Sequence, residues 1–120
     1  MKPLANKQPN TIILHIGTNH LNRKINTFDN LSCVISEIKS RSKDTQVVVS
    51  GLTTRHDKPE MDTNVRSLNE ELKVFCKNNC IDYINNDNID LQCLSRKKLH
   101  LNQKGTSRLA KNFKAFIDTN

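Results

Sequence analysis

Two apolar runs that each end at a glycine constrain the fold of this chain most strongly. The first, Ile12–Ile16, is apolar except for His15 and stops at Gly17. The second, Gln46–Ser50, contains three consecutive valines and stops at Gly51. Runs without polar alternation are typical of parallel strands covered on both faces, and a glycine lets the backbone turn sharply where a strand ends. We therefore expect two buried parallel strands, with polar residues after each at the sheet edge where α/β proteins bind ligands.

Segments with helical periodicity alternate with these strands. Apolar residues recur at spacings of three and four over residues 28–38, 65–76 and 109–117, which predicts three helices with one apolar face each. A weaker strand is expected at Ile81–Ile84. The order is then strand, helix, strand, helix, strand, loop, helix. This order predicts a single α/β domain over residues 1–120, with a parallel sheet and right-handed crossovers.

The ends of the predicted elements follow from turn and cap residues. Residues 1–10, which include two prolines, form a lead-in to the first strand. Ser, Thr, Asp and Asn cap helices because their side chains accept hydrogen bonds from the first turn. On this basis the helices begin at Thr27, at Asp62 or Thr63, and near Asn102.

The charge of the chain indicates the kind of partner it can bind. The net charge is +7, which favours an anionic partner such as nucleic acid or an acidic surface. The first residues lack the apolar core of a signal peptide, and no stretch approaches the roughly 18 apolar residues of a membrane span. We therefore expect an intracellular, cytoplasmic protein.

The four cysteines are expected to be reduced, because no secretion signal is found. Cys76 and Cys80 are spaced to lie on one helical face, where they could supply half of a metal site. No second pair with ligand spacing accompanies them. We therefore expect structural thiols and no metal centre.

Two short segments, one after the first predicted strand and one before the last predicted helix, carry the strongest functional signal. Gly17-Thr18-Asn19 follows the first strand, and Leu99–Gly105 (Leu-His-Leu-Asn-Gln-Lys-Gly) precedes the last helix. In this order they resemble the third and fifth sequence blocks of the SGNH hydrolases, also called GDSL-type esterases. Those blocks are a G-x-N-D loop and a D-x-x-H-x-N-x-x-G segment. The resemblance covers the chain after its first few residues, and it implies a three-layer, flavodoxin-like α/β fold with helices on both faces of a parallel sheet.

The resemblance also implies a serine esterase site. In the family a serine attacks the carbonyl of a carboxylic ester, a histidine takes the serine proton, and backbone and asparagine N–H groups hold the oxyanion. Asn19 matches the oxyanion-hole asparagine, Gly17 and Thr18 support its loop, and His100 matches the general base. The implied substrate is a carboxylic ester, and the implied chemistry uses neither a metal nor an organic cofactor.

Three departures from the family pattern predict impaired catalysis. The aspartate that orients the histidine is replaced by Lys97, a cation that disfavours the imidazolium. His20 replaces the acid of the G-x-N-D block. No Gly-Asp-Ser block precedes the Ile12 strand, so the nucleophile and the family's first strand or strands are not found. We expect a truncated or degenerate form, a pseudoenzyme, whose open sheet edge causes self-association or instability.

Each candidate residue also has a structural interpretation. Asn19 can be an ordinary turn residue, and His100 can be a surface histidine. Asn102 is better explained as a helix N-cap than as a ligand contact. Ser50 is a weak substitute for the nucleophile, because no Gly-x-Ser-x-Gly elbow surrounds it. His15 is expected to be packed and neutral.

The alternative function is a basic binding module. Seven cations occur near the last helix: Arg96, Lys97, Lys98, Lys104, Arg108, Lys111 and Lys114. They could bind nucleic-acid phosphates or another anion weakly, although no aromatic residues are interleaved for base stacking. The chain looks especially like the esterase-like domains of invertebrate retroelement-type proteins, in which Lys-Leu-His-Leu-Asn is a familiar variant.

Overall fold

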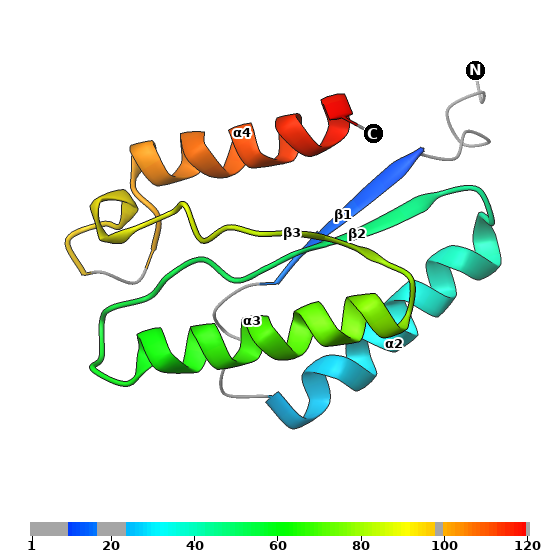
Figure 1. The fold of residues 1–120 in the computed structure, drawn as a ribbon, viewed down its shortest axis with the longest axis horizontal. Helices are drawn as coiled ribbons and strands as arrows, with labels where there is room; N and C mark the ends of the chain where they lie inside the picture. Colours follow the sequence, from blue (N-terminus) through cyan, green and yellow to red (C-terminus); the bar gives the residue numbers. More distant parts are fainter. Residues whose placement is uncertain (1–9, 17–23, 98–99, 120) are drawn as a thin grey trace, which may run out of the picture.

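The elements of the protein follow the predicted order. The computed structural model describes residues 10–16, 24–97 and 100–119, with the backbone alone for 24–27. The elements are β1 (Thr11–His15), α2 (Lys24–Arg41), β2 (Gln46–Ser50), α3 (Met61–Asn78), β3 (Asp82–Ile84), the 3-10 helix η2 (Leu91–Cys93) and α4 (Gln103–Thr119) (Figure 1). The predicted alternation of strands and helices is confirmed.

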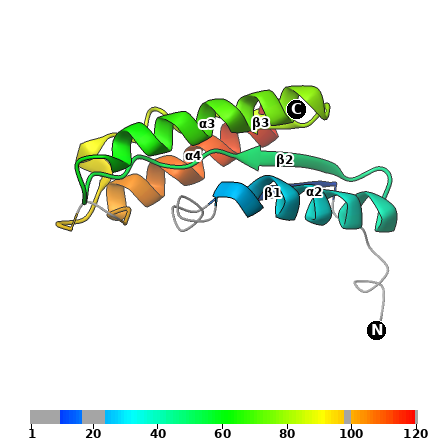
Figure 2. The ribbon, with the colours of Figure 1, turned by 90° about the horizontal axis from the view of Figure 1, so that it is seen from below.

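The strands form one parallel sheet with the order β1-β2-β3. β2 is the central strand of the three. It pairs with β1 along its whole length, so that Ile13 lies opposite Val48, and it pairs with β3 from Val48 onward. Helices α2 and α3 cover one face of the sheet and α4 covers the other (Figures 1 and 2). The three-layer α/β fold expected from the sequence is therefore present.

The main core lies between the sheet and helices α2 and α3. Its buried members are Ile16, Leu31, Val49, Leu52, Val65, Leu68, Leu72 and Cys76. The spacing of the α3 members at three and four residues places them on one helical face, as the periodicity predicts. The β2 side chains Val47, Val48 and Val49 are at most 3% exposed. Their burial fits a strand covered on both faces.

Two helix starts differ from the prediction. Helix α2 begins at Lys24, ahead of Thr27, so Thr27 is not its N-cap. Helix α3 begins at Met61 after Glu60, which makes no side-chain cap hydrogen bond. In α3 the first residue, Met61, is buried, so packing of the apolar face extends this helix ahead of Asp62. No helix in the described part of the chain is long and apolar enough to cross a membrane.

Helix α4 buries less of its apolar face than its periodicity suggests. Gly105 is the one fully buried residue among those described in this helix. Leu109, Phe113 and Phe116 are half-buried, whereas Ile117 is 54% exposed. Periodicity reports which side chains share a face, and it does not report how much of that face another element covers.

The cysteine pair does not share a helical face. Helix α3 ends at Asn78, so Cys80 lies beyond it, in a turn with a positive φ of 56°, and is exposed. Cys76 is buried, and desolvation raises the pKa of its thiol to about 11. Cys76 therefore fits the predicted structural thiol. Across residues 10–16, 24–97 and 100–119, no group of His, Cys, Asp and Glu side chains could hold a metal ion.

Candidate active site

His100 lies in the connection between η2 and α4. An isolated antiparallel bridge joins Leu94 to Leu101, and the Ser95 N–H donates to the His100 carbonyl at 2.7 Å. These backbone contacts hold both sides of the connection. The His100 side chain itself is exposed. A histidine in this position can reach a substrate in solvent, as a general base must.

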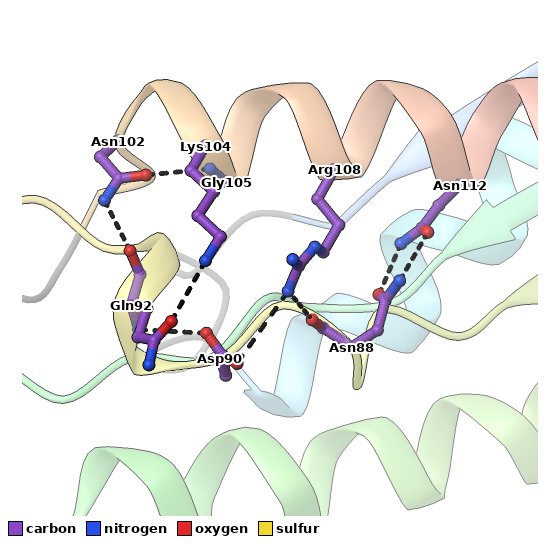
Figure 3. Close-up of polar contacts among 8 residues, drawn as sticks. All are labelled: Asn88, Asp90, Gln92, Asn102, Lys104, Gly105, Arg108 and Asn112. Carbon is purple, nitrogen blue, oxygen red and sulfur yellow. Dashed lines mark hydrogen bonds and ion pairs between the residues drawn. The ribbon is translucent and has the colours of Figure 1, made fainter.

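Asn102 and Gly105 fix the connection to the start of α4 (Figure 3). The Asn102 Oδ1 accepts from the Gly105 N–H at 2.9 Å, which confirms Asn102 as the N-cap. Its Nδ2 donates to the carbonyl oxygens of Gln92 and Leu94, at 2.8 and 2.9 Å. Gly105 is buried against the Cys93 backbone carbonyl, and a Cβ there would collide with that oxygen. The Asn-x-x-Gly spacing therefore clamps η2 to the helix and positions the residues just before it.

The predicted basic stripe of α4 is partly used inside the chain. Figure 3 shows that Lys104, Arg108 and Asn112 point from one side of α4 toward the segment 88–92. The Lys104 Nζ donates to the Gln92 Oε1 at 3.1 Å, and the Arg108 Nη1 donates to the Asn88 carbonyl at 2.9 Å. A rather long ion pair of 4.0 Å joins Arg108 to Asp90.

The other cations of the stripe differ in their contacts. Lys114 pairs with Asp118 on the helix surface at 2.7 Å, where both side chains are exposed. Lys97 and Lys111 are exposed, and in the part of the chain that the structure describes neither has a polar partner. The spacing of the cations along α4 could not predict which of them bind within the chain. Their partners lie in the segment 88–92, which has no periodicity of its own.

Ser50 is buried at the end of β2 and has no exposed surface. Asn86 donates from Nδ2 to the Ser50 Oγ at 2.8 Å and to the Gly51 carbonyl at 2.7 Å. The Ser50 Oγ also lies 2.8 Å from the His15 Nδ1. Since Oγ accepts from Asn86, the serine hydroxyl can donate to the imidazole. The resulting Ser-His pair ties β2 to β1, but no substrate carbonyl can reach a serine buried in this way.

His15 differs from the packed histidine expected from the sequence. It is exposed on the edge strand, with its ring edge-on to Phe113 at a centroid distance of 6.1 Å. Partial burial of the ring lowers the pKa of His15. The imidazole is therefore neutral near pH 7, as predicted, although it is less enclosed.

A cleft of about 490 Å³ opens beyond the carboxyl ends of β2 and β3. Its walls come from the loop after β2, the part of α3 from Asp62 to Lys73, and the segment 86–91. Within it, the Thr54 Oγ1 lies 2.8 Å from the His56 Nε2 and donates to the Asp62 Oδ1 at 3.2 Å. The loop is also held by Arg55, which makes two hydrogen bonds to Asp57. The loop after β2 is therefore a structured wall of the cleft.

Asn69 is an important residue that sequence reasoning missed. It is buried in α3, where its Oδ1 accepts from the Leu52 N–H at 2.8 Å and its Nδ2 donates to the Leu52 carbonyl at 3.1 Å. The side chain thus replaces a strand partner for the backbone just after β2. The available signal was an asparagine within the apolar stripe of α3, between Leu68 and Leu72.

The predicted oxyanion-hole loop lies outside the described residues. This applies to Gly17, Thr18 and Asn19, and to His20 and Lys98 in the neighbouring motifs. The structure therefore brings together the histidine half of the predicted site, through His100, Asn102 and Gly105. The pairing of Asn19 with His100 stays a prediction.

The sequence matches no family profile and no curated protein. Three solved structures nevertheless share the fold over nearly the whole chain. A GDSL-like lipase from Bacteroides thetaiotaomicron VPI-5482 has a TM-score of 0.69 at 17% identity, covering 92% of this chain and 63% of that one. A member of the lipolytic G-D-S-L family from Veillonella parvula DSM 2008 has a TM-score of 0.67 at 20% identity, with coverages of 91% and 65%.

The third structure is that of a protein assigned to the G-D-S-L family, from Desulfitobacterium hafniense DCB-2. Its TM-score is 0.64 at 12% identity, and the alignment covers 92% of this chain and 66% of that one. The chain thus spans slightly under two thirds of the length of each of these structures. At this level of identity the likeness concerns the fold. The chain has the α/β fold of the SGNH, or GDSL-type, hydrolases.

Proposed function

We propose that this chain is the part of an SGNH-type ester hydrolase domain that carries the general base and the oxyanion-hole asparagine. The main support is the position of His100. It is exposed directly before α4, and the two further motif residues, Asn102 and Gly105, hold that junction. The start of α4 and the loop after β2 lie at the same end of the molecule (Figure 1), which is the end where α/β sheets bind ligands.

On this proposal the chain hydrolyses esters weakly or not at all by itself. The 120 residues contain no Gly-Asp-Ser block before β1, and Ser50 is too buried to replace its serine. Lys97 stands where the family has the aspartate that stabilises the histidine as a cation. A lysine at this position cannot orient the imidazole or stabilise the imidazolium formed during catalysis, so the base step is weakened as well.

The substrate class that we propose is a carboxylic ester with an acetyl or lipid-like acyl group. The structural neighbours are named as lipolytic proteins, which supports an acyl ester over other substrates. Hydrolysis would pass through attack of a nucleophile on the carbonyl carbon, with Asn19 donating to the oxyanion and His100 taking the proton.

Turnover of p-nitrophenyl acetate tests this proposal. We expect the wild-type chain to hydrolyse the ester no faster than His100→Ala, with both rates close to the rate without protein. Ser50→Ala serves as a matched control for the buried serine. A clear rate that is lost in His100→Ala and kept in Ser50→Ala would show that the chain contains its own nucleophile. It would contradict the proposal that catalysis by this chain is impaired.

The basic-module alternative is tested by binding of single-stranded RNA at increasing salt. Lys97 and Lys111 are the exposed cations to change, because Lys104 and Arg108 also hold the segment 88–92. We expect affinity to fall steeply with salt and to fall further in the double variant Lys97→Glu, Lys111→Glu. Binding that is absent, or that is insensitive to salt, would remove the alternative.

A further inference from the structure

Strand β1 has an open edge in the described part of the chain. It pairs with β2 on one side, and no described strand pairs with the other side. The Ile16 N–H donates to the Ser50 carbonyl, and the Asn10 carbonyl accepts from Gln46. Backbone groups alternate in direction along a strand. The N–H and C=O groups of the even-numbered residues therefore point toward β2. The N–H and C=O groups of Thr11, Ile13 and His15 therefore point outward.

The two edges of the sheet are protected very differently. At one edge, strand β3 has three residues and begins with the exposed Asp82. The Asp82 carboxylate accepts a hydrogen bond from the Gln46 side chain at 2.6 Å. A short strand with a charge discourages pairing with another chain. The segment Asn10–Ile16 has neither protection, because it is longer and contains no Lys, Arg, Asp, Glu or Pro. Such an edge is a template for strand addition.

The side-chain pattern of β1 is self-complementary. Read in either direction from Ile13, the strand is apolar for one residue and then polar, with Thr11 at one end and His15 at the other. In an antiparallel pair of two copies with Ile13 at the centre, Thr11 lies opposite His15 of the second copy. Ile12 lies opposite Leu14 of the second copy. Polar side chains then meet polar ones, and apolar side chains meet apolar ones.

The hydrogen-bond directions fit the same register. In this register Ile13 lies opposite Ile13 of the second copy, and Thr11 lies opposite His15 of the second copy. The backbone N–H and C=O groups of all these residues point away from β2. Residues in such pairs exchange both N–H···O bonds. A shift by one residue would place outward groups opposite inward ones and would lose these bonds. The register is therefore set both by the backbone and by the side chains.

We propose that the open edge of β1 binds β1 of a second copy of this chain in antiparallel orientation, centred on Ile13. The result is a two-fold symmetric dimer with one continuous sheet, β3-β2-β1-β1-β2-β3. The same patch serves both copies, as a two-fold interface requires. Each copy carries a net charge of +7, which opposes association, so the dimer is expected to strengthen with added salt.

The first test is sedimentation equilibrium of the full chain at increasing protein concentration. Ile13→Pro removes an outward N–H that β2 does not use, and it removes one from each copy of the dimer. We expect a monomer–dimer equilibrium for the wild type and a weakening of about tenfold or more in Ile13→Pro, with an unchanged circular dichroism spectrum. The control Val74→Lys, at a 57% exposed apolar position on α3, should dimerise like the wild type.

Three results of this test would overturn the proposal. One is a wild-type monomer at all concentrations, which would mean that a different segment covers the edge or that nothing does. Another is a dimer that survives Ile13→Pro. The third is a dimer that is lost in Val74→Lys, because association would then use the exposed apolar surface of α3.

A cross-linking test covers the case in which Ile13→Pro fails to fold. Ile13→Cys is made with Cys33→Ser and Cys80→Ser, which remove the two exposed native thiols. In the proposed register the two Cα atoms at position 13 are about 5.5 Å apart, within disulfide range. Oxidised glutathione should then link the dimer at position 13. Ile12→Cys in the same background should not link, because its own counterpart is offset along the strand. Equal linking at both positions, or none at position 13, would contradict the register.

Discussion

Strands β1 and β2 have similar sequences and very different surroundings. Both are five residues long, and each has three consecutive apolar residues at its centre. Val47, Val48 and Val49 of β2 are almost completely buried, because strands lie on both sides and helices cover both faces. The corresponding residues of β1, Ile12, Ile13 and Leu14, are half-buried. The difference shows that an apolar run predicts a strand with both faces covered by helices. It does not predict how many strands lie beside it, because that depends on the rest of the fold.

The polar contacts repeat this difference. The end of β2 is held by Asn69 at the Leu52 backbone, by Asn86 at Gly51, and by the Ser50 hydroxyl. The end of β1 has one described side-chain link of this kind, from His15 to Ser50. The central strand is therefore fixed by the chain itself. The outward backbone groups of the edge strand β1 pair with no other strand in the part of the chain that the structure describes.

The largest expected effect is at Asn69. Asn69→Leu leaves the N–H and C=O of Leu52 without their partners in a buried place, and it should lower the free energy of unfolding by about 3 kcal/mol. Urea unfolding followed by circular dichroism measures this. The control Asn64→Leu is exposed on the same helix and should change stability by less than about 0.5 kcal/mol. Equal effects would mean that Asn69 does not hold the end of β2.

A direct comparison of the strands uses Val48 and Ile13, which lie opposite each other in the ladder. Val48→Ala should cost about 2 kcal/mol, because its side chain is completely buried. Ile13→Ala removes one more carbon, yet it should cost only about 1 kcal/mol because the side chain is half-exposed. The measurement is urea unfolding at a concentration low enough to keep the chain monomeric. A larger loss for Ile13→Ala would indicate that β1 is covered after all.

The predictions from sequence were accurate where a pattern is local and failed where partners come from distant segments. The strand and helix order, the N-cap role of Asn102 and the neutral state of His15 follow from short-range patterns. The roles of Asn69, Lys104 and Arg108 depend on Leu52, Gln92 and Asn88, which no periodicity connects to them. The exposure of Ile117 has the same cause, because amphipathicity gives the face of α4 and not its cover.

The smallest effect is a pH dependence at the link between β1 and β2. Because burial lowers the pKa of His15 below 6.5, protonation is less favourable in the folded chain than in the unfolded chain. The contribution of neutral His15 to the free energy of unfolding is therefore complete above pH 6.5. It is lost as the pH falls through the lower pKa of the folded chain. Unfolding between about pH 7 and pH 5 should show a steeper loss of stability for the wild type than for His15→Gln. Identical slopes would mean that His15 titrates as it does in the unfolded chain.

Backbone amide exchange resolved by NMR tests the open edge of β1 most directly. The amides of Ile12 and Leu14 face β2, so their protection should not depend on protein concentration. The amides of Ile13 and His15 point outward. They should exchange rapidly in dilute protein and become protected as the concentration rises and the second copy binds. Outward amides that exchange rapidly at every concentration, or that are protected at every concentration, would contradict the account.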